Sequence, residues 1–404
     1  MSISEEAPST LRLPERARLL HIGLMKTGTT SLQNAAAALR PQLLQNGVRY
    51  PGRSTNHRSA VNDFMGHSWG WGTTPVAGAW SKVKAEIDAD LENRIWLGHE
   101  FGANADDETA ARWRDELGDR AHVVVTLRNY AALLPSVWQQ TTKEGDRWPF
   151  DEWLAGVLSD DPSDELRPFR DRHDQGRVVS RWAQAFGPEN VTVVVVDKSS
   201  PDLLFDAFER MLDLETGLLA SAPLDGKSTN RGMSIEESEF LRVLNLTLRE
   251  ELTWHEYCKW LRDAASTALL RRRQPGEHDT RFVLPTWAAD AAHERSLEFV
   301  DAIDRSGVRV IGELDRLSTE VRAAQAPPLG ADVVPIDAAA EALLGVIRQG
   351  LRDETRLKDA RRRIKSLEKA AAAHRPSGTA IEAASGRELV HELGSRLRRR
   401  LRRG

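Results

Sequence analysis

Several features that define common protein classes are missing from this sequence. The single cysteine, Cys258, excludes an intrachain disulfide, and we expect it to be a buried or partly buried thiol. No run of about 18 apolar residues occurs, so no membrane-spanning helix is predicted. The opening residues, MSISEEAPSTLRLPERAR, lack the basic and then apolar segments of a signal peptide. We therefore expect a soluble, cytoplasmic protein.

A strong positive charge is also absent. The formal net charge is -4 and the pI is about 6.3, whereas a domain that binds duplex nucleic acid is usually basic, so no nucleic-acid partner is predicted. The chain does have length and apolar content. Its 404 residues are 40% hydrophobic, which is enough for one large or two small domains with a real core.

Short apolar runs recur along the first three quarters of the chain. They are rich in β-branched residues and nearly continuous, as in strands that are buried on both faces of a parallel sheet. The runs lie at 19–24, 94–98, 122–127, 191–196 and 308–312. Helical patterns separate them, at 31–45, 108–117, 178–187 and 201–213. This alternation predicts an α/β fold with a central, mostly parallel sheet flanked by helices, and ligands beyond the carboxyl ends of the strands.

Changes in composition divide the chain into four segments. We expect an N-terminal tail over 1–17, an α/β domain over 18–322, a linker rich in Pro, Gly and Ala over 323–335, and a helical, basic extension over 336–404. Within the α/β domain, residues 52–80 are rich in Gly, Ser, Thr, His and Trp and have no long period. We predict a long irregular loop there, of the kind that is often functional.

The C-terminal extension has two distinct parts. Leu357, Ala360, Ile364 and Leu367 repeat at helical spacing, which is typical of a short amphipathic helix or coiled coil. The last residues, HELGSRLRRRLRRG, combine leucines on one helical face with many arginines. They fit either a basic patch for an anionic membrane surface, which would place the protein at the inner face of the membrane, or a solvated tail.

The first apolar run leads into a glycine turn, LLHIGLMKTGTTSLQ. Gly23 and Gly28 have the spacing of a phosphate-binding P-loop, G-x-x-x-x-G-K-[ST]. The residue after Gly28 is Thr29, however, and the lysine, Lys26, lies two residues before Gly28. The runs at 94–98 and 122–127 lead into His99 and Arg128 rather than into an aspartate that could hold Mg²⁺. The fold is thus predicted to be P-loop NTPase-like, without the parts that organise Mg-ATP.

What remains of this turn is suited to an oxyanion. Gly28 allows close approach of the backbone, and the amides at the start of the following helix point at the ligand. Thr29, Thr30 and Ser31 add hydroxyl groups, and Lys26 adds a positive charge. The alternative is an ordinary strand–turn–helix connection with a chance lysine.

A second anion site is predicted after the strand at 122–127. Arg128 follows this strand directly and can fork onto a phosphate group. Ser136 lies eight residues later, after Pro135, which we place at the first position of a helix. Taken alone, an arginine and a helix-capping serine are common, but two anion sites in this order strengthen each other.

Together these motifs resemble the sulfotransferases that use 3′-phosphoadenosine 5′-phosphosulfate (PAPS). The loop GLMKTGTTSLQ is similar to their 5′-phosphosulfate loop and departs at Met25, where many members have proline. The resemblance spans about residues 18 to 318. It implies that Lys26, Thr27, Gly28, Thr29, Thr30 and Ser31 bind the phosphosulfate group, and that Arg128 and Ser136 bind the 3′-phosphate.

A third segment, LDGKSTNRGMSIEESEFLRVLN, resembles the late loop and helix near the nucleotide in this family. The resemblance makes Lys227, Asn230 and Arg231 candidate contacts. A solvated turn followed by a helix with a capping box, Ser234 with Glu237, explains part of the same pattern.

The implied reaction is transfer of a sulfuryl group from PAPS to a hydroxyl or amine of a carbohydrate, glycolipid or small metabolite. No metal and no protein nucleophile is required, since the donor is already activated. Lys26 would neutralise the leaving phosphate oxygen. The general base would follow the strand at 94–98. We prefer Glu100, then His99, with His57 in the long loop as a third candidate, although each also has an ordinary structural explanation.

Other features of the sequence stay open. Trp69, Trp71 and Trp80 lie in the predicted long loop and fit either acceptor contact or packing. The alternative functions are a P-loop kinase or NTPase-like nucleotide-binding protein, and a non-catalytic scaffold that docks through its basic tail. The acceptor and the oligomeric state cannot be read from the sequence.

Overall fold

The computed structural model describes residues 11–197, 199–223, 231–277 and 279–373. The chain divides into two compact units, Met1–Val346 and Ile347–Gly404. The first contains the α/β fold described below, and the second contains most of the long C-terminal helix. Among the described residues, no helix combines the length and hydropathy that a membrane crossing needs.

The main sheet has six strands, all parallel, in the order β2-β3-β1-β4-β5-β7. The strands are β1 (Arg18–His21), β2 (Val48–Arg49), β3 (Arg94–Gly98), β4 (Ala121–Leu127), β5 (Val191–Val195) and β7 (Arg309–Ile311). A second small sheet pairs β6 (Leu284–Pro285) with β8 (Ala323–Ala324). Every residue of β3, β4 and β5 is buried, as expected for strands covered on both faces. The predicted α/β fold is confirmed.

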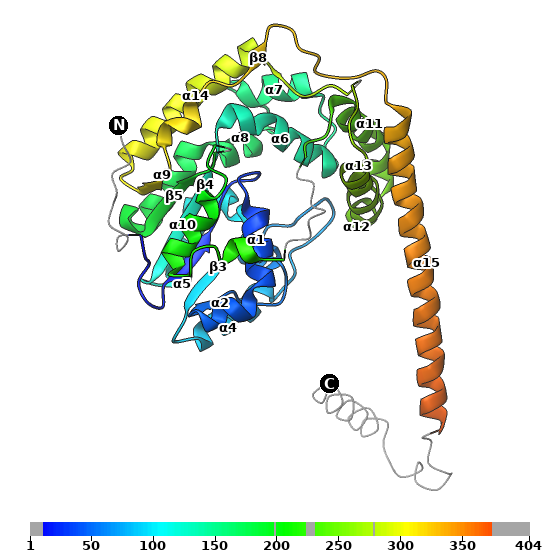
Figure 1. Cartoon of the computed structure of the whole chain (residues 1–404), viewed down its shortest axis with the longest axis horizontal. Coiled ribbons are helices and arrows are strands. Elements are labelled where there is room, and N and C mark those ends of the chain that lie inside the picture. Colours follow the sequence, from blue (N-terminus) through cyan, green and yellow to red (C-terminus); the bar gives the residue numbers. More distant parts are fainter. Residues whose placement is uncertain (1–10, 198, 224–230, 278, 374–404) are drawn as a thin grey trace. The chain divides into compact units, whose positions relative to one another are not determined.

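Helices lie between the strands and beyond them (Figure 1). The α-helices are α1 (Thr29–Ala38), α2 (Arg40–Gln45), α3 (Arg58–Met65), α4 (Ala79–Ala89), α5 (Asp107–Leu117), α6 (Tyr130–Lys143), α7 (Phe150–Leu158), α8 (Arg167–His173), α9 (Gln175–Phe186), α10 (Leu203–Leu212), α11 (Ile235–Glu251), α12 (Trp254–Tyr257), α13 (Thr267–Arg272), α14 (Thr286–Arg305) and α15 (Ile336–Ala373). Short 3₁₀ segments are η1 (Glu100–Asn104), η2 (Pro188–Asn190), η3 (Leu219–Ser221) and η5 (Leu314–Ser318), and η4 (Cys258–Ser266) is a π-helix.

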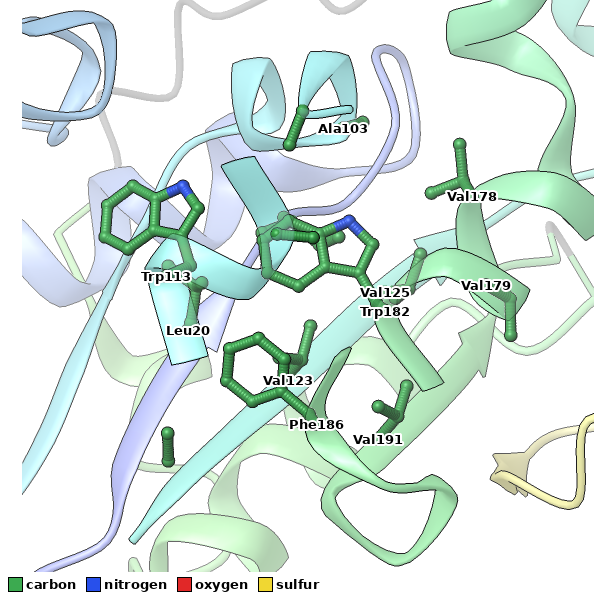
Figure 2. Close-up of a cluster of buried hydrophobic side chains, with 14 of the residues drawn as sticks. Leu20, Ala103, Trp113, Val123, Val125, Val178, Val179, Trp182, Phe186 and Val191 are labelled. Atoms are coloured by element: carbon green, nitrogen blue, oxygen red, sulfur yellow. The ribbon is translucent and has the colours of Figure 1, made fainter. Parts of the chain in front are cut away.

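Two apolar layers cover the two faces of the sheet. On one face α3, α4, α5 and α9 pack on alternate strand residues. Figure 2 shows Trp182 and Phe186 of α9 beside Val125 and Val123 of β4, and Trp113 of α5 beside Leu20 of β1. On the other face α1, α2 and α10 pack on the intervening strand residues. Because both layers bury strand side chains, the open edge for a ligand is the carboxyl end of the strands.

Two local expectations were wrong. Residues 52–80 are not one irregular loop, since α3 forms within them and buries Val61 and Met65 against the sheet. Pro135 is not at the first position of a helix. It is the sixth residue of α6, which begins at Tyr130 and is capped by the side chain of Asn129. The helix tolerates the proline because its other residues bury Leu133, Leu134, Val137 and Trp138 in a separate apolar cluster.

The capping box that the sequence predicts is present. Ser234 accepts a hydrogen bond from the backbone N–H of Glu237 at 3.1 Å, and the Glu237 carboxylate accepts one from the backbone N–H of Ser234 at 3.0 Å. Helix α11 begins directly afterwards. The expected helix in the C-terminal extension is α15, whose stripe residues Leu357, Ile364 and Leu367 are exposed.

Candidate active site

The glycine turn after β1 has the strained backbone that a close-fitting anion site needs. Gly28 has φ of 87°, and a Cβ added there would lie 2.5 Å from a methyl carbon of Leu204. Lys26 has φ of 65°, one of three non-glycine residues with positive φ in the described part of the chain. Such strain persists only where the surroundings enforce it, and it concentrates at functional sites. Helix α1 follows, and no side chain caps its N-terminus.

Buried hydroxyl groups hold this turn against the sheet. Thr27 donates a hydrogen bond to the carbonyl oxygen of Leu24 at 2.6 Å, and its hydroxyl lies 2.7 Å from that of Thr126 on β4. His21 Nε2 is 3.3 Å from the same Thr126 hydroxyl. Gly23 must be glycine, since an added Cβ would lie 1.8 Å from Thr126 Oγ1. The Thr27 side chain is therefore part of the support of the turn, while Thr29, Thr30 and Ser31 open the helix.

Positive charges gather around Lys26. Crowding by neighbouring atoms and the charge of Arg128 lower the pKa of Lys26, although the residue keeps access to solvent. Burial, then Lys26 and Arg262, lower the pKa of Lys143 to about 8. Burial also lowers the pKa of Arg128. Like charges disfavour each other in this way only when they are close together. Lys26, Arg128 and Lys143 therefore lie near enough for their charges to interact.

These cations have little compensation from carboxylates. Among the residues that the structure describes, the side chains of Lys26, Arg128 and Lys143 have no carboxylate within ion-pair distance. The charge of Glu144 acts on Lys26 and Lys143, and that of Asp197 acts on Arg128. Burial raises the pKa of Glu144, which favours its neutral form. Arg128 and Lys143 are partly buried. Partly desolvated cations without ion-pair partners are costly in a folded protein, and a bound anion reduces that cost.

Glu100 lies at the same edge, at the start of η1 after β3. Gln33 of α1 donates a hydrogen bond to Glu100 Oε2 at 3.0 Å. Burial raises the pKa of Glu100, although hydrogen bonds from Gln33 and Thr29 and the charge of Arg58 oppose this effect. The carboxylate is thus attached to the helix that opens at the glycine turn. A raised pKa is the direction of shift that is common for a carboxylate that acts as a general base.

His99 is oriented toward Glu100. Its Nδ1 accepts a hydrogen bond from the backbone N–H of Phe101 at 3.2 Å, and its Nε2 lies 3.4 Å from Glu100 Oε2. Burial, with Arg58, lowers the pKa of His99 to about 3, so the ring is neutral and carries its proton on Nε2. Both ring nitrogens therefore have neighbours, and the geometry favours Glu100 as the base.

His57 is held by the backbone. Its Nε2 is 2.9 Å from the carbonyl oxygen of Pro51, and its Nδ1 accepts from the backbone N–H of Gly98 at 3.3 Å. Burial lowers its pKa to about 4. These contacts join the start of α3 to the end of β3, and they leave no ring nitrogen for a substrate.

The other residues that the sequence predicts as nucleotide contacts are Ser136, Arg231, Lys227 and Asn230. Ser136 lies within α6 and is half-buried, so its hydroxyl is not at a helix N-terminus. Arg231 forms a two-pronged ion pair with Glu237, at 2.7 and 2.8 Å, and also donates to the carbonyl oxygen of Leu269. Lys227 and Asn230 fall outside the described residues.

Three charged residues of this region have no place in the sequence analysis. They are Lys143 and Glu144 at the end of α6, and Arg172 of α8, whose Nη1 lies 3.9 Å from the sulfur of Met25. Arg172 and Glu144 also line a cavity of about 670 Å³. No local motif marks them, and only the packing of α6 and α8 near the glycine turn brings them together.

The tryptophans of residues 52–80 separate into two groups. Trp80 is buried in the sheet core, in edge contact with Trp113 at 4.9 Å between ring centroids, so it is not available to an acceptor. Trp71 donates to the carbonyl oxygen of Leu252 at 3.1 Å and packs on Trp254. Trp69 is half-buried.

Buried histidines predict an acid-sensitive fold. Burial is the main cause that lowers the pKa of five histidines to about 3 or 4. These residues are His21, His57, His99, His122 and His173. The ordinary value is 6.5, so the unfolded chain binds protons that the folded chain does not. Stability is therefore complete above about pH 6.5 and is lost as the pH falls toward 4. We expect the melting temperature to decrease steadily from pH 7 to pH 5.

Thermal unfolding at several pH values checks this expectation. His122→Gln, which can keep the contact to the hydroxyl of Thr192 seen at 2.8 Å, should make the decrease shallower. His67→Gln, at an exposed position, is the matched control and should leave it unchanged. A melting temperature that is constant between pH 7 and pH 5 would contradict the argument.

Comparisons with known proteins add little at the level of function. No protein-family model matches this chain, and no curated protein matches it. A solved structure of a sulfotransferase from Alicyclobacillus acidocaldarius is similar at 18% sequence identity, over 60% of this chain and 98% of that chain, with a TM-score of 0.37. A likeness at this level concerns the fold alone, and we draw nothing about activity from it.

Proposed function

We propose that this protein transfers a sulfuryl group from PAPS to a hydroxyl or amine of an acceptor. One observation carries the proposal. Lys26 and Arg128, the two cations that the sequence assigns to the two ends of a nucleotide, follow the carboxyl ends of the paired parallel strands β1 and β4, and neither side chain forms an ion pair within the described ranges. A cosubstrate with phosphate groups at both ends supplies the missing negative charge.

Each group of the site has a role in this proposal. The amides of Thr29 and Thr30 at the open end of α1, with Lys26, bind the phosphosulfate group. Arg128 binds the 3′-phosphate, together with Ser136 of α6. Thr27 and Thr126 keep the turn rigid through their buried hydroxyl contact. Such preorganised donors stabilise developing charge without further rearrangement.

The transfer needs a proton acceptor and a stabilised leaving group. PAPS supplies an activated sulfuryl group, so the acceptor oxygen forms the new S–O bond while the bond from sulfur to the phosphate oxygen breaks. Lys26 holds the negative charge that stays on that phosphate oxygen. Glu100 takes the acceptor's proton, and His99 keeps the Glu100 carboxylate in place. No protein nucleophile takes part.

The alternative of a kinase or NTPase fits the turn less well. A lysine directly after Gly28 would reach the outer phosphates in such proteins, and Thr29 occupies that position. Lys26 instead approaches from the other side of the turn, from a strained backbone position.

Ligand-dependent melting temperatures separate the two functions. Adenosine 3′,5′-bisphosphate, the product nucleotide, is expected to raise the melting temperature by about 4 °C at a hundredfold excess over Kd, without magnesium. ATP with magnesium should raise it less. Stabilisation by ATP with magnesium, and none by the bisphosphate, would support the kinase or NTPase instead.

A further inference from the structure

Two arginines share one tryptophan beside the candidate active site. The guanidinium carbon of Arg58 lies 3.7 Å from the ring centroid of Trp69, and that of Arg262 lies 4.5 Å from it. Arg58 opens α3, Trp69 follows this helix, and Arg262 belongs to the π-helix η4. Segments nearly 200 residues apart in sequence therefore meet here. π-helical segments are rare and often occur at functional sites.

Glu100 and Glu144 act on Arg58 through their charge, and Glu144 also interacts with Arg262, but neither carboxylate forms an ion pair with these arginines in the part of the chain that the structure describes. In the described ranges the Arg58 side chain has no ion pair, and Arg262 pairs with its exposed neighbour Asp263 at 2.9 Å. Burial and the charge of Arg262 lower the pKa of Arg58. Both side chains are half-buried. Stacking fixes a guanidinium in one plane and leaves its edge free, which is the arrangement for two-pronged binding of a carboxylate or a similar anion.

The pair is next to the proposed base. The charge of Arg58 acts on Glu100 and on His99, and that of Arg262 acts on Lys143. Lys26 and Arg128 are used by the nucleotide in the proposed function. Helix α3, which begins at Arg58, contacts η1, which begins at Glu100, and α6, which ends at Lys143, contacts η4. Arg58, Arg262 and Lys143 are then left over near Glu100.

We propose that Arg58 and Arg262, fixed by Trp69 and assisted by Lys143, bind a negatively charged group of the acceptor. The acceptor is then a molecule that carries, besides the reacting hydroxyl, a carboxylate, sulfate or phosphate group of its own. This inference rests on the proposed function, because it assumes that Lys26 and Arg128 are occupied by the nucleotide. It extends that function in two ways. The acceptor carries a negatively charged group, and named residues bind that group.

Binding to the nucleotide-saturated protein tests the subsite. The protein is saturated with adenosine 3′,5′-bisphosphate and titrated with glucuronate, glucose 6-sulfate and glucose as probes, by calorimetry. The two anionic sugars should bind about tenfold or more tighter than glucose, the effect of one charge-assisted contact. Two different anions are used because a carboxylate and a sulfate ester share the required charge, and the stronger of the two identifies the group that the arginines prefer.

Variants show whether the arginines are responsible. Arg58→Ala and Arg262→Ala should each remove the preference for the anionic sugars, while the Kd of the bisphosphate changes less than about twofold. Arg112→Ala is the matched control, because Arg112 of α5 likewise stacks on an aromatic residue of α3, Phe64, at 4.8 Å, but is exposed. It should keep the preference.

The outcomes separate the two proposals. Equal binding of glucose and the anionic sugars, or a preference that survives both arginine variants, would overturn the anionic subsite. A protein that fails to bind the bisphosphate at all would instead overturn the proposed function on which the subsite depends. Folding of each variant is confirmed by its melting temperature, and Trp69→Phe, which keeps an aromatic ring, should retain part of the preference.

Discussion

Lys26→Ala is expected to lower the rate of sulfuryl transfer by about 10²–10³-fold, the usual effect of removing one preorganised group that stabilises developing charge. Lys26 is exposed, and its side chain makes no ion pair among the described residues, so the fold should not depend on it. The measurement is the turnover of sulfur-labelled PAPS with a fixed acceptor mixture. The melting temperature should change little.

A second variant, Lys26→Gly, uses the positive φ angle of Lys26. Lys26 has φ of 65°, a conformation that glycine adopts without cost. Lys26→Gly should therefore be at least as stable as the natural protein and still be inactive, which separates the amine from the shape of the turn. Lys82→Ala on α4, at an exposed position, is the matched control and should be fully active. Normal turnover in the glycine variant would show that the amine has no role.

Glu100→Gln is expected to lower transfer by about 10²–10⁴-fold, the range for loss of a general base. The amide keeps an oxygen that can accept the hydrogen bond from Gln33, now 3.0 Å long, so the local structure should persist. His99→Asn should lower the rate less, since His99 acts only through Glu100. A larger loss in His99→Asn than in Glu100→Gln would reverse the two assignments.

The pH dependence of transfer gives an independent measurement of the base. Glu100 works as a carboxylate, and burial raises its pKa above the ordinary 4.5. Activity should therefore rise with pH, with a midpoint above 4.5, and fall as the pH decreases through the folded pKa. The acid limb should disappear from the residual activity of Glu100→Gln. An unchanged limb in this variant would mean that another group titrates.

The elements that the sequence predicts well are those with a local signal. Strand β3 was predicted at its observed bounds, 94–98. Its apolar run, with the residue on each side, is buried throughout, as the sequence pattern indicates. The glycine turn and the following helix were predictable because Gly28 and the hydroxyl residues act within one short stretch. Strand β2 has two residues, too few for a periodic pattern, and it joins the sheet only by pairing with β3.

The expectations that were wrong concern local patterns that tertiary packing overrides. Pro135 has a strong preference for the start of a helix, yet α6 begins five residues earlier because Asn129 caps it and the apolar residues on both sides of the proline are buried together. In residues 52–80, polar composition predicts a loop, but Val61 and Met65 bury enough apolar surface to form α3. The tryptophans of this segment are neighbours in sequence, but in the structure Trp80 packs in the sheet core while Trp71 packs on Trp254.

The sequence by itself determined the α/β fold and the glycine turn with its misplaced lysine, because hydrophobic periodicity and turn chemistry operate over a few neighbouring residues. It also determined which residues follow the strands, and so which side chains can reach the ligand edge. Only the tertiary structure decided which charges meet there. Lys143, Arg58 and Arg262 come from three distant helical segments, and electrostatic interaction depends on distance in space, which no spacing along the chain records.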